Sequence, residues 1–192
     1  MRFINTKFIK SASKKDEFIV DSLPQVAVVG RSNVGKSSLI NLLTNNSKMA
    51  KTSSTPGRTR LVNYFNVGEK FYLVDLPGYG YNKASKSIAD SWDMVMNDYF
   101  VDNERLKVVL LLLDSRIMPT ELDKQMLDFL AEHDIPVVIV LTKIDKLSRS
   151  DLNMNIGKIS DIIRYSRERI VPTSASKKQG VERIGELLDE FV

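Results

Sequence analysis

Hydrophobic residues in this 192-residue chain fall into short runs rich in β-branched side chains, separated by longer stretches with helical spacing. Short runs of this kind predict strands that are mostly buried on both faces. We expect strands at 25–29, 61–67, 70–74, 108–113, 137–141 and, from a weaker pattern, 169–171. The helical patterns cover 36–44, 87–100, 120–133, 151–166 and 181–191. Strands that alternate with helices predict an α/β fold with a largely parallel sheet.

The strands expected at 61–67 and 70–74 are separated only by Gly68 and Glu69. A two-residue loop predicts a β-hairpin, and a hairpin makes its two strands antiparallel. We therefore expect a mixed, mostly parallel sheet of about six strands with one antiparallel edge strand. Two long irregular stretches, 45–60 and 77–86, interrupt the pattern. Loops of that length in a compact domain are usually functional or mobile.

The composition is that of one globular domain, because 43% of the residues are hydrophobic and 27% are charged. We expect a single domain over 1–192, with an N-terminal extension at 1–22 and the main folded part at 23–192. The absence of cysteine excludes a disulfide framework and a cysteine-bound zinc site. The sequence shows neither a signal-peptide pattern nor an apolar run of about 18 residues, so we expect a cytoplasmic protein without a membrane span.

The net charge of +4 leaves two interpretations open. It is typical of a lysine-rich solvated surface, and it also suits a phosphate-rich partner such as RNA, bound through lysine and arginine contacts. Composition alone does not decide between them.

A phosphate-binding motif follows the first expected strand and precedes the first expected helix. The eight residues match G-x-x-x-x-G-K-[ST], and this context supports the match. Glycines let successive N–H groups and the helix N-terminus face the α- and β-phosphates of a nucleotide. Lys36 is expected to reach the β- and γ-phosphates, and Ser37 is expected to bind Mg²⁺. The nucleotide-binding loop consists of Gly30, Arg31, Ser32, Asn33, Val34, Gly35, Lys36 and Ser37.

An acidic motif, Asp75-Leu76-Pro77-Gly78, ends the second strand of the expected hairpin. Asp75 would hold Mg²⁺ through a water molecule, and the Gly78 amide would meet the γ-phosphate. The same four residues are also an ordinary turn sequence. Their position after the strand that follows the phosphate-binding loop favours the functional interpretation.

A phosphate-binding loop does not distinguish GTP from ATP, but a second motif does. Thr142, Lys143, Ile144 and Asp145 follow another apolar strand. The Asp145 carboxylate only accepts hydrogen bonds, which suits guanine N1–H and its exocyclic amine, whereas adenine would leave the carboxylate unpaired. The Lys143 stem can lie across the base. Backbone N–H groups after the last strand could meet guanine O6, and they belong to Thr173, Ser174 and Ala175.

These motifs together resemble the translation-factor-related (Era-like) P-loop GTPases, and within them closely the EngB (YihA/YsxC) family of bacterial GTP-binding proteins. The resemblance runs from about Leu23 to the C-terminus and rests on GRSNVGKSSLIN, STPGRT, DLPGYGY, TKID and a Ser-Ala pair. It implies a three-layer Ras-like fold, GTP hydrolysis with Mg²⁺, a role in large ribosomal subunit assembly, and a requirement for normal cell division and septation. The expected partners are GTP or GDP and the large subunit or its rRNA, without DNA, and the expected state is a monomer.

The resemblance also identifies two switch segments. The first consists of Gly57, Arg58, Thr59, Arg60 and Leu61, and the second covers 77–86. The Thr59 hydroxyl would complete the Mg²⁺ shell, with Thr52 and Thr55 as nearby alternatives. A γ-phosphate would draw the first loop closed, and its loss would release the loop.

Tyr79 departs from the Ras-like pattern, because many GTPases carry a water-orienting glutamine at that position. We therefore expect slow intrinsic hydrolysis. Asn33 matches an asparagine that coordinates K⁺ in several related GTPases, and such a cation would act as an arginine finger does. Arg58 is an alternative finger. The residues with expected catalytic roles are Asn33, Lys36, Thr59 and Gly78.

A second departure is Thr142, where the most familiar base motif has asparagine. We expect Asp145 to preserve guanine selectivity, with moderate affinity. Three functions remain in competition: a ribosome-directed GTPase switch, a metabolic ATPase or nucleotide kinase, and a scaffold that binds GTP without turnover. Asp145 and the lack of an inserted lid argue against the second, and Tyr79 keeps the third open.

Overall fold

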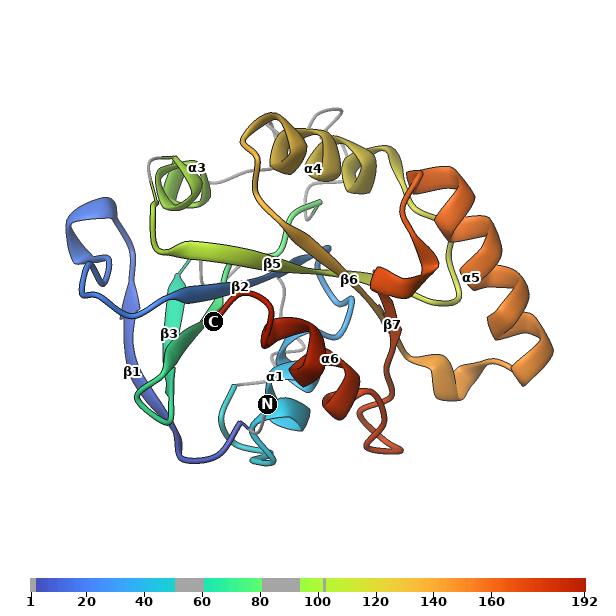
Figure 1. The fold of residues 1–192 in the computed structure, drawn as a ribbon, viewed down its shortest axis with the longest axis horizontal. Helices are drawn as coiled ribbons and strands as arrows, with labels where there is room; N and C mark the ends of the chain where they lie inside the picture. The colour runs from blue at the N-terminus through green and yellow to red at the C-terminus, as the bar shows by residue number, and fades with distance from the viewer. Residues whose placement is uncertain (1–2, 51–60, 81–93, 102) are drawn as a thin grey trace.

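The computed structural model describes residues 3–50, 61–80, 94–101 and 103–192. Within these residues the chain forms a seven-stranded mixed sheet with helices on both faces (Figure 1). The strands are β1 (Thr6–Ala12), β2 (Gln25–Gly30), β3 (Val62–Val67), β4 (Phe71–Asp75), β5 (Leu106–Asp114), β6 (Val137–Thr142) and β7 (Ile170–Pro172). The helices are α1 (Lys36–Leu43), α3 (Met94–Phe100), α4 (Glu121–Glu132), α5 (Arg149–Ile163) and α6 (Val181–Leu188), with short 3-10 turns at Lys15–Glu17, Ile144–Lys146 and Arg167–Arg169.

The strands lie in the order β1-β3-β4-β2-β5-β6-β7. Strands β4, β2, β5, β6 and β7 run parallel to their neighbours in this series, whereas β3 runs antiparallel to β4, as the two-residue hairpin predicts. Parallel strands all end at the same edge of a sheet, and ligands of α/β proteins bind outside that edge. The topology therefore brings the ends of five strands to one place.

One strand, β1, differs from the expectation, because the hydrophobic pattern predicts no strand in the 1–22 segment. β1 pairs antiparallel with β3, so it is the sheet edge and covers the hairpin. Most of its side chains are exposed or half-buried, and the register shifts between Phe8 and Lys10. An edge strand with a bulge lacks the continuous apolar run of a central strand. The predicted α/β class is confirmed, with one strand more than expected.

The described helices match the predicted ones within a few residues at each end. α4 begins where Asp123 accepts hydrogen bonds from both the backbone N–H and the hydroxyl of Thr120, each at 2.7 Å. α5 begins where the Ser148 hydroxyl accepts from the backbone N–H of Asp151 at 3.1 Å. Such contacts satisfy N–H groups that have no partner inside a helix. The helix predicted at 87–100 is described as α3 from Met94 onward, and 87–93 lie outside the described residues.

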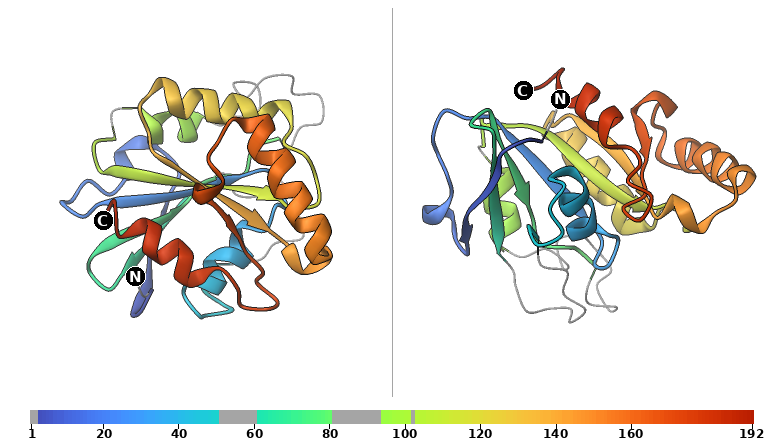
Figure 2. Two further views of the ribbon diagram at one scale, coloured as in Figure 1. Left: turned by 45° about the vertical axis from the view of Figure 1, so that its right-hand side comes forward. Right: turned by 90° about the horizontal axis from the view of Figure 1, so that it is seen from below.

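Two hydrophobic clusters hold the helices against the sheet. Helices α3, α4 and α5 pack on one face through side chains such as Tyr99, Met126 and Ile159. α1 and α6 pack on the opposite face through side chains such as Ile40 and Leu188. Figure 1 shows α3 and α4 above the sheet with α1 and α6 below it, and the left view of Figure 2 shows the same separation. The result is the three-layer arrangement that the resemblance implies.

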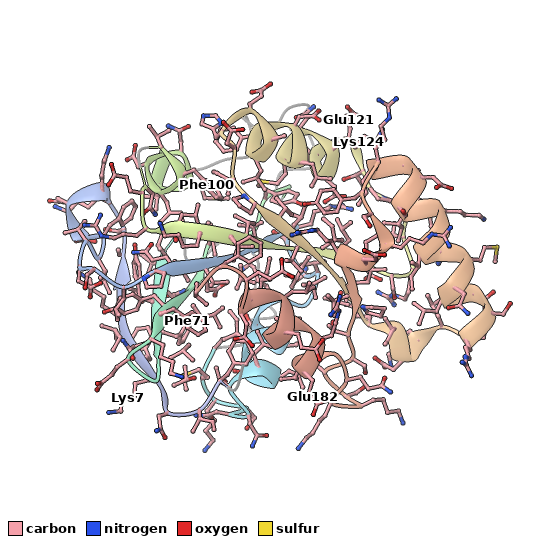
Figure 3. The ribbon with its side chains drawn as sticks, viewed as in Figure 1. Lys7, Phe71, Phe100, Glu121, Lys124 and Glu182 are labelled. Carbon is pink, nitrogen blue, oxygen red and sulfur yellow. The ribbon has the colours of Figure 1, made fainter. Side chains whose placement is uncertain are left out.

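Side chains on the outer surface of α4 contrast with those that join it to α3. Glu121 and Lys124 point outward from α4 (Figure 3), and their ion pair of 3.1 Å is exposed. On the inner side, Phe100 of α3 meets Phe129 of α4 with ring centroids 5.6 Å apart.

None of the helices described is long and apolar enough to cross a lipid bilayer.

Candidate nucleotide-binding site

The candidate site lies at the carboxyl edge of the parallel strands. Strands β2, β4, β5, β6 and β7 end at Gly30, Asp75, Asp114, Thr142 and Pro172. The ends of β2, β4, β6 and β7 each carry a motif predicted from the sequence, and the end of β5 does not. The fold therefore assembles the phosphate-binding loop, the acidic motif and the base motif at one edge of the sheet.

Two glycines give the phosphate-binding loop its shape. A Cβ added to Gly30 would lie 2.8 Å from Cγ1 of Val34 and 3.0 Å from Cβ of Leu112, so a side chain has no room there. Gly35 has a φ of 115°, which L side chains rarely adopt, and α1 begins directly after it. The unpaired N–H groups of the first turn of α1 can therefore face an anion at the end of β2.

Lys36 and Asp75 form a mostly buried ion pair. Nζ of Lys36 lies 2.6 Å from Oδ1 of Asp75, and the two side chains are 16% and 11% exposed. Ser37 follows Lys36 in the first turn of α1. A hydroxyl and a carboxylate are hard oxygen donors of the kind that Mg²⁺ takes alongside substrate phosphates. These residues fit a magnesium ion held together with a nucleotide, in the roles predicted for Ser37 and Asp75.

Gly78 and Tyr79 lie directly against the phosphate-binding loop. A Cβ on Gly78 would come within 3.2 Å of the backbone nitrogen of Ser32. The Tyr79 N–H donates to the Gly30 carbonyl at 3.3 Å, and the Ser32 N–H donates to the Tyr79 carbonyl at 3.0 Å. The backbone of the acidic motif is therefore fixed to the loop that receives the phosphates.

The Tyr79 side chain is fully buried. Its hydroxyl donates to Oδ1 of Asp123, on α4, at 2.7 Å. Burial raises the pKa of the phenol well above its ordinary value of 10, so it stays neutral. Because the Tyr79 side chain is buried and bound to α4, it does not orient an attacking water as a mobile glutamine would.

Asp145 is held as an ionised hydrogen-bond acceptor. The Ser174 hydroxyl donates to Oδ1 of Asp145 at 2.7 Å, and this hydrogen bond lowers the pKa of the carboxyl below its ordinary value. The Ile144 N–H donates to the Thr173 carbonyl at 3.3 Å, which ties the base motif to the segment after β7. Ser174 thus orients Asp145 through its side chain, whereas the sequence suggested only backbone contacts with guanine at this position.

Thr142 and Lys143 join the base motif to the phosphate-binding loop. The Thr142 hydroxyl donates to the Val34 carbonyl at 2.6 Å in a buried position. Nζ of Lys143 donates to the Asn33 carbonyl at 2.9 Å. Threonine in place of the familiar asparagine therefore still provides a donor that links the two motifs.

Asp114 is a site residue that the sequence interpretation missed. Its carboxylate accepts from Nζ of Lys143 at 3.0 Å and from Nε and Nη2 of Arg116 at 2.9 and 2.8 Å. Burial alone would raise the pKa of Asp114, but the hydrogen bonds from Arg116 and Lys143 outweigh burial and lower it to about 2. The sequence signal was an Asp-Ser-Arg sequence at the end of an apolar strand, in the same place as the other motifs.

A pocket of about 210 Å³ lies between α1 and the base motif. Leu39 and Leu42 of α1 line one side, and Thr142, Lys143, Asp145 and Ala175 line the other. The space is smaller than that of a typical whole-ligand site, which spans roughly 300–1,000 Å³. An apolar wall facing an ionised acceptor suits one planar base with N–H donors on its edge.

The proposed first switch is mostly beyond what the structure describes. Gly57, Arg58, Thr59 and Arg60 lie outside the described residues, as do the alternatives Thr52 and Thr55. Leu61 is described and half-buried just before β3. Of the second switch, residues 77–80 are described and 81–86 are not. The roles assigned to the first switch stay predictions.

Comparisons with known proteins agree with this site. A family model described as "50S ribosome-binding GTPase" matches residues 25–143. A protein from Clostridium beijerinckii named "Probable GTP-binding protein EngB" is 47% identical over 192 residues, covering 100% of this chain and 96% of the relative. A protein of the same name from Desulforamulus reducens is 43% identical over 194 residues, covering 100% and 95%.

Solved structures share the fold. The crystal structure of "a probable GTP-binding protein engB" has a TM-score of 0.68 at 22% identity, covering 86% of this chain and 97% of that one. Era in complex with MgGDPNP and nucleotides 1506–1542 of 16S ribosomal RNA has a TM-score of 0.66 at 26% identity, covering 88% and 56%. NFeoB from S. thermophilus bound to GDP.AlF4- and K⁺ has a TM-score of 0.64 at 26% identity, covering 88% and 62%. The family model, the full-length relatives and the geometry of the site agree, and this chain belongs to the EngB family of P-loop GTPases.

Proposed function

We propose that this GTPase is a nucleotide-dependent switch that assists assembly of the large ribosomal subunit and is needed for normal cell division and septation. One observation carries the proposal. Asp145 is an ionised acceptor, and its neighbours Thr142 and Lys143 bind the phosphate-binding loop directly. The description of the matching family model as ribosome-binding supports the choice of partner. The setting is a monomer in the cytoplasm, without DNA.

In this proposal, different residues of the chain contact the base and the phosphates of the nucleotide. Asp145 accepts from the guanine N1–H and amine, and the Lys143 stem lies across the base. The N–H groups of the phosphate-binding loop and Lys36 hold the phosphates. Ser37 and Thr59 would bind Mg²⁺ directly and Asp75 would hold it through water, and the ion would supply positive charge that offsets the charge developing on the phosphate oxygens.

Hydrolysis forms a bond from a water oxygen to the γ-phosphorus and breaks the bond to the β–γ bridging oxygen, which gives GDP and phosphate. Lys36 and the Gly78 N–H stabilise the negative charge of the transferring group. Tyr79 occupies the sequence position of the usual glutamine, and its hydroxyl is bound to Asp123 of α4, so its side chain does not orient the attacking water. Turnover is therefore slow unless another group contributes.

A potassium ion bound with the help of Asn33 is the candidate for that contribution. The Asn33 side chain is exposed, and its backbone has a φ of 64°, so it lies at an outward bend of the loop. The NFeoB neighbour was solved with K⁺ and a GDP.AlF4- complex. Hydrolysis should be faster in K⁺ than in Na⁺ at equal ionic strength, and Asn33→Ala should remove the difference. Equal rates in both salts for the unaltered protein would exclude this role.

Co-sedimentation with large ribosomal subunits tests the switch itself. The protein is compared with GDP and with a non-hydrolysable GTP analogue at two salt concentrations. We expect tighter binding with the analogue, weakened by salt, since rRNA contacts depend on lysine and arginine. Lack of binding in both nucleotide states would remove the ribosome from the proposal and leave a GTPase with another partner.

A second candidate is a scaffold that binds GTP with negligible turnover and contacts division or ribosomal proteins. The burial of Tyr79 is the observation that favours it. Phosphate release measured with and without large subunits separates the two. Turnover that stays negligible under both conditions supports the scaffold, whereas stimulation by the subunit supports the switch.

A further inference from the structure

Tyr79 connects two parts of the molecule that are far apart in sequence. Its backbone exchanges hydrogen bonds with Gly30 and Ser32 in the phosphate-binding loop. Its side chain crosses the interior to Asp123, in the first turn of α4. Gly78, the predicted γ-phosphate contact, directly precedes this doubly fixed residue.

Asp123 is built into this connection as an acceptor with several donors. It is only 3% exposed. Oδ1 accepts from the Tyr79 hydroxyl at 2.7 Å, and Oδ2 accepts from the N–H and the hydroxyl of Thr120, each at 2.7 Å. Hydrogen bonds to both oxygens offset part of the cost of burying a carboxylate, and removal of one donor leaves an oxygen unpaired. The orientation of the Tyr79 side chain is therefore fixed by the start of α4.

We infer that Tyr79 and Asp123 are positioning residues that hold the Gly78 N–H where a γ-phosphate is received. The inference rests on the proposed role of Gly78. A Cβ at Gly78 would come within 3.2 Å of Ser32, so a small shift of this backbone changes its relation to the phosphate-binding loop. The Tyr79 hydroxyl limits that shift by anchoring the next residue to α4.

Nucleotide selectivity follows from this arrangement. GDP has no γ-phosphate, so its affinity does not depend on the Gly78 N–H. GTP makes the extra contact only when Gly78 is in place. Loosening the Tyr79–Asp123 contact should therefore weaken GTP binding and leave GDP binding nearly unchanged. A side chain that serves only stability would affect both nucleotides equally.

Tyr79→Phe removes the hydroxyl and keeps the ring. Affinities for GDP and for a non-hydrolysable GTP analogue are measured with Mg²⁺ by calorimetry on the full chain. We expect the analogue to bind about five to tenfold more weakly, as for the loss of one buried hydrogen bond, and GDP to stay within about twofold. Tyr165→Phe is the matched control, because the hydroxyl of Tyr165, which follows α5, also donates a 2.7 Å hydrogen bond, to the carbonyl of Val137 at the start of β6. The control should leave the ratio of the two affinities unchanged.

Asp123→Leu provides a second variant that keeps the test decisive if Tyr79→Phe folds poorly, and Asp123→Asn is its conservative control. Asparagine retains one oxygen that can accept from Tyr79, but its amide cannot accept from Thr120. We expect a lower melting temperature with the affinity ratio within about twofold of the unaltered protein. In contrast, Asp123→Leu, which offers Tyr79 no acceptor, should weaken analogue binding selectively.

Two results would overturn the inference while the proposed function stands. One is equal weakening of GDP and analogue in Tyr79→Phe, and the other is an unchanged ratio in Tyr79→Phe or, where that variant does not fold, in Asp123→Leu. Failure of the unaltered protein to bind guanine nucleotides with Mg²⁺ would instead overturn the proposed function, and the inference with it.

Discussion

The base-reading end and the phosphate-binding end of this site are organised differently. At the base end, neighbouring residues hold Asp145, Lys143 and Thr142 in fixed orientations. At the phosphate end, Lys36 and Asp75 are paired with each other at 2.6 Å. In the proposed function Lys36 reaches the phosphates and Asp75 holds Mg²⁺ through water, so we expect this pair to change when a nucleotide binds. We therefore expect the prearranged base motif to select the nucleotide and a rearrangement at the phosphates to report its state.

The largest effect is expected from Lys36→Ala at the phosphate end. The change removes the phosphate contact and leaves Asp75 as a buried charge without its partner. We expect GTP affinity to fall by about 100-fold or more, because such truncations cost roughly 2–5 kcal/mol. Calorimetric titration measures the affinity, and Lys124→Ala, which breaks only an exposed ion pair, is the control. A loss below tenfold would mean that Lys36 stays with Asp75 when nucleotide binds.

Asp145→Asn tests the base end. The substitution replaces an acceptor with a group that can donate, so it no longer matches the guanine amine, but it can donate to the C2 oxygen of xanthine. We expect GTP affinity to fall about 100-fold and xanthosine triphosphate to become the better ligand, since sites built for one hydrogen-bond pattern reject its opposite. Competition binding with both nucleotides measures the change. Retained GTP preference would show that Asp145 does not read the base.

We expect Asp114 to make the free energy of unfolding depend on pH in the acid range. Its pKa is about 2 in the folded chain against an ordinary 3.8, so its contribution is full above pH 3.8 and is lost as the pH falls towards 2. The contribution should be about 1–2 kcal/mol, reduced by solvent around Arg116, which is 43% exposed. Urea unfolding from pH 5 to pH 2 measures it. Asp114→Asn should flatten the pH dependence, and an unchanged slope would contradict the role.

The smallest effect is expected from Thr142→Val, which keeps the shape and removes one hydroxyl. The Val34 carbonyl loses its 2.6 Å donor, so we expect about 1 kcal/mol less stability and a few-fold weaker GDP binding. Chemical denaturation and GDP titration measure the two effects. Thr142→Asn, which restores a donor, should recover most of the affinity, and failure to do so would show that the contact is not the cause.

The sequence predicted the central fold well, because buried parallel strands leave continuous apolar runs. β1 escaped prediction because an edge strand exposes one side and carries lysines. The phosphate and base motifs were found because their chemistry restricts residue type and spacing. Asp114 was missed because its importance comes from contacts with Lys143 and Arg116, which only the fold shows.

Tyr79 is a second residue whose contacts could not be predicted from the sequence. Its sequence position identified it as a departure from the glutamine pattern, but its burial against Asp123 depends on a contact 44 residues away. The link from Thr142 to Val34 spans 108 residues and was equally out of reach. Local patterns thus locate the motifs, and the tertiary contacts determine how each motif is held.

The most direct test of this account is a pair of crystal structures, one without nucleotide and one with Mg²⁺ and a non-hydrolysable GTP analogue. We expect the contacts of Thr142, Lys143 and Asp145 to be the same in both structures, and Lys36 to leave Asp75 for the phosphates. An unbroken Lys36–Asp75 pair in the nucleotide complex, or a base motif that forms only when nucleotide is bound, would contradict it.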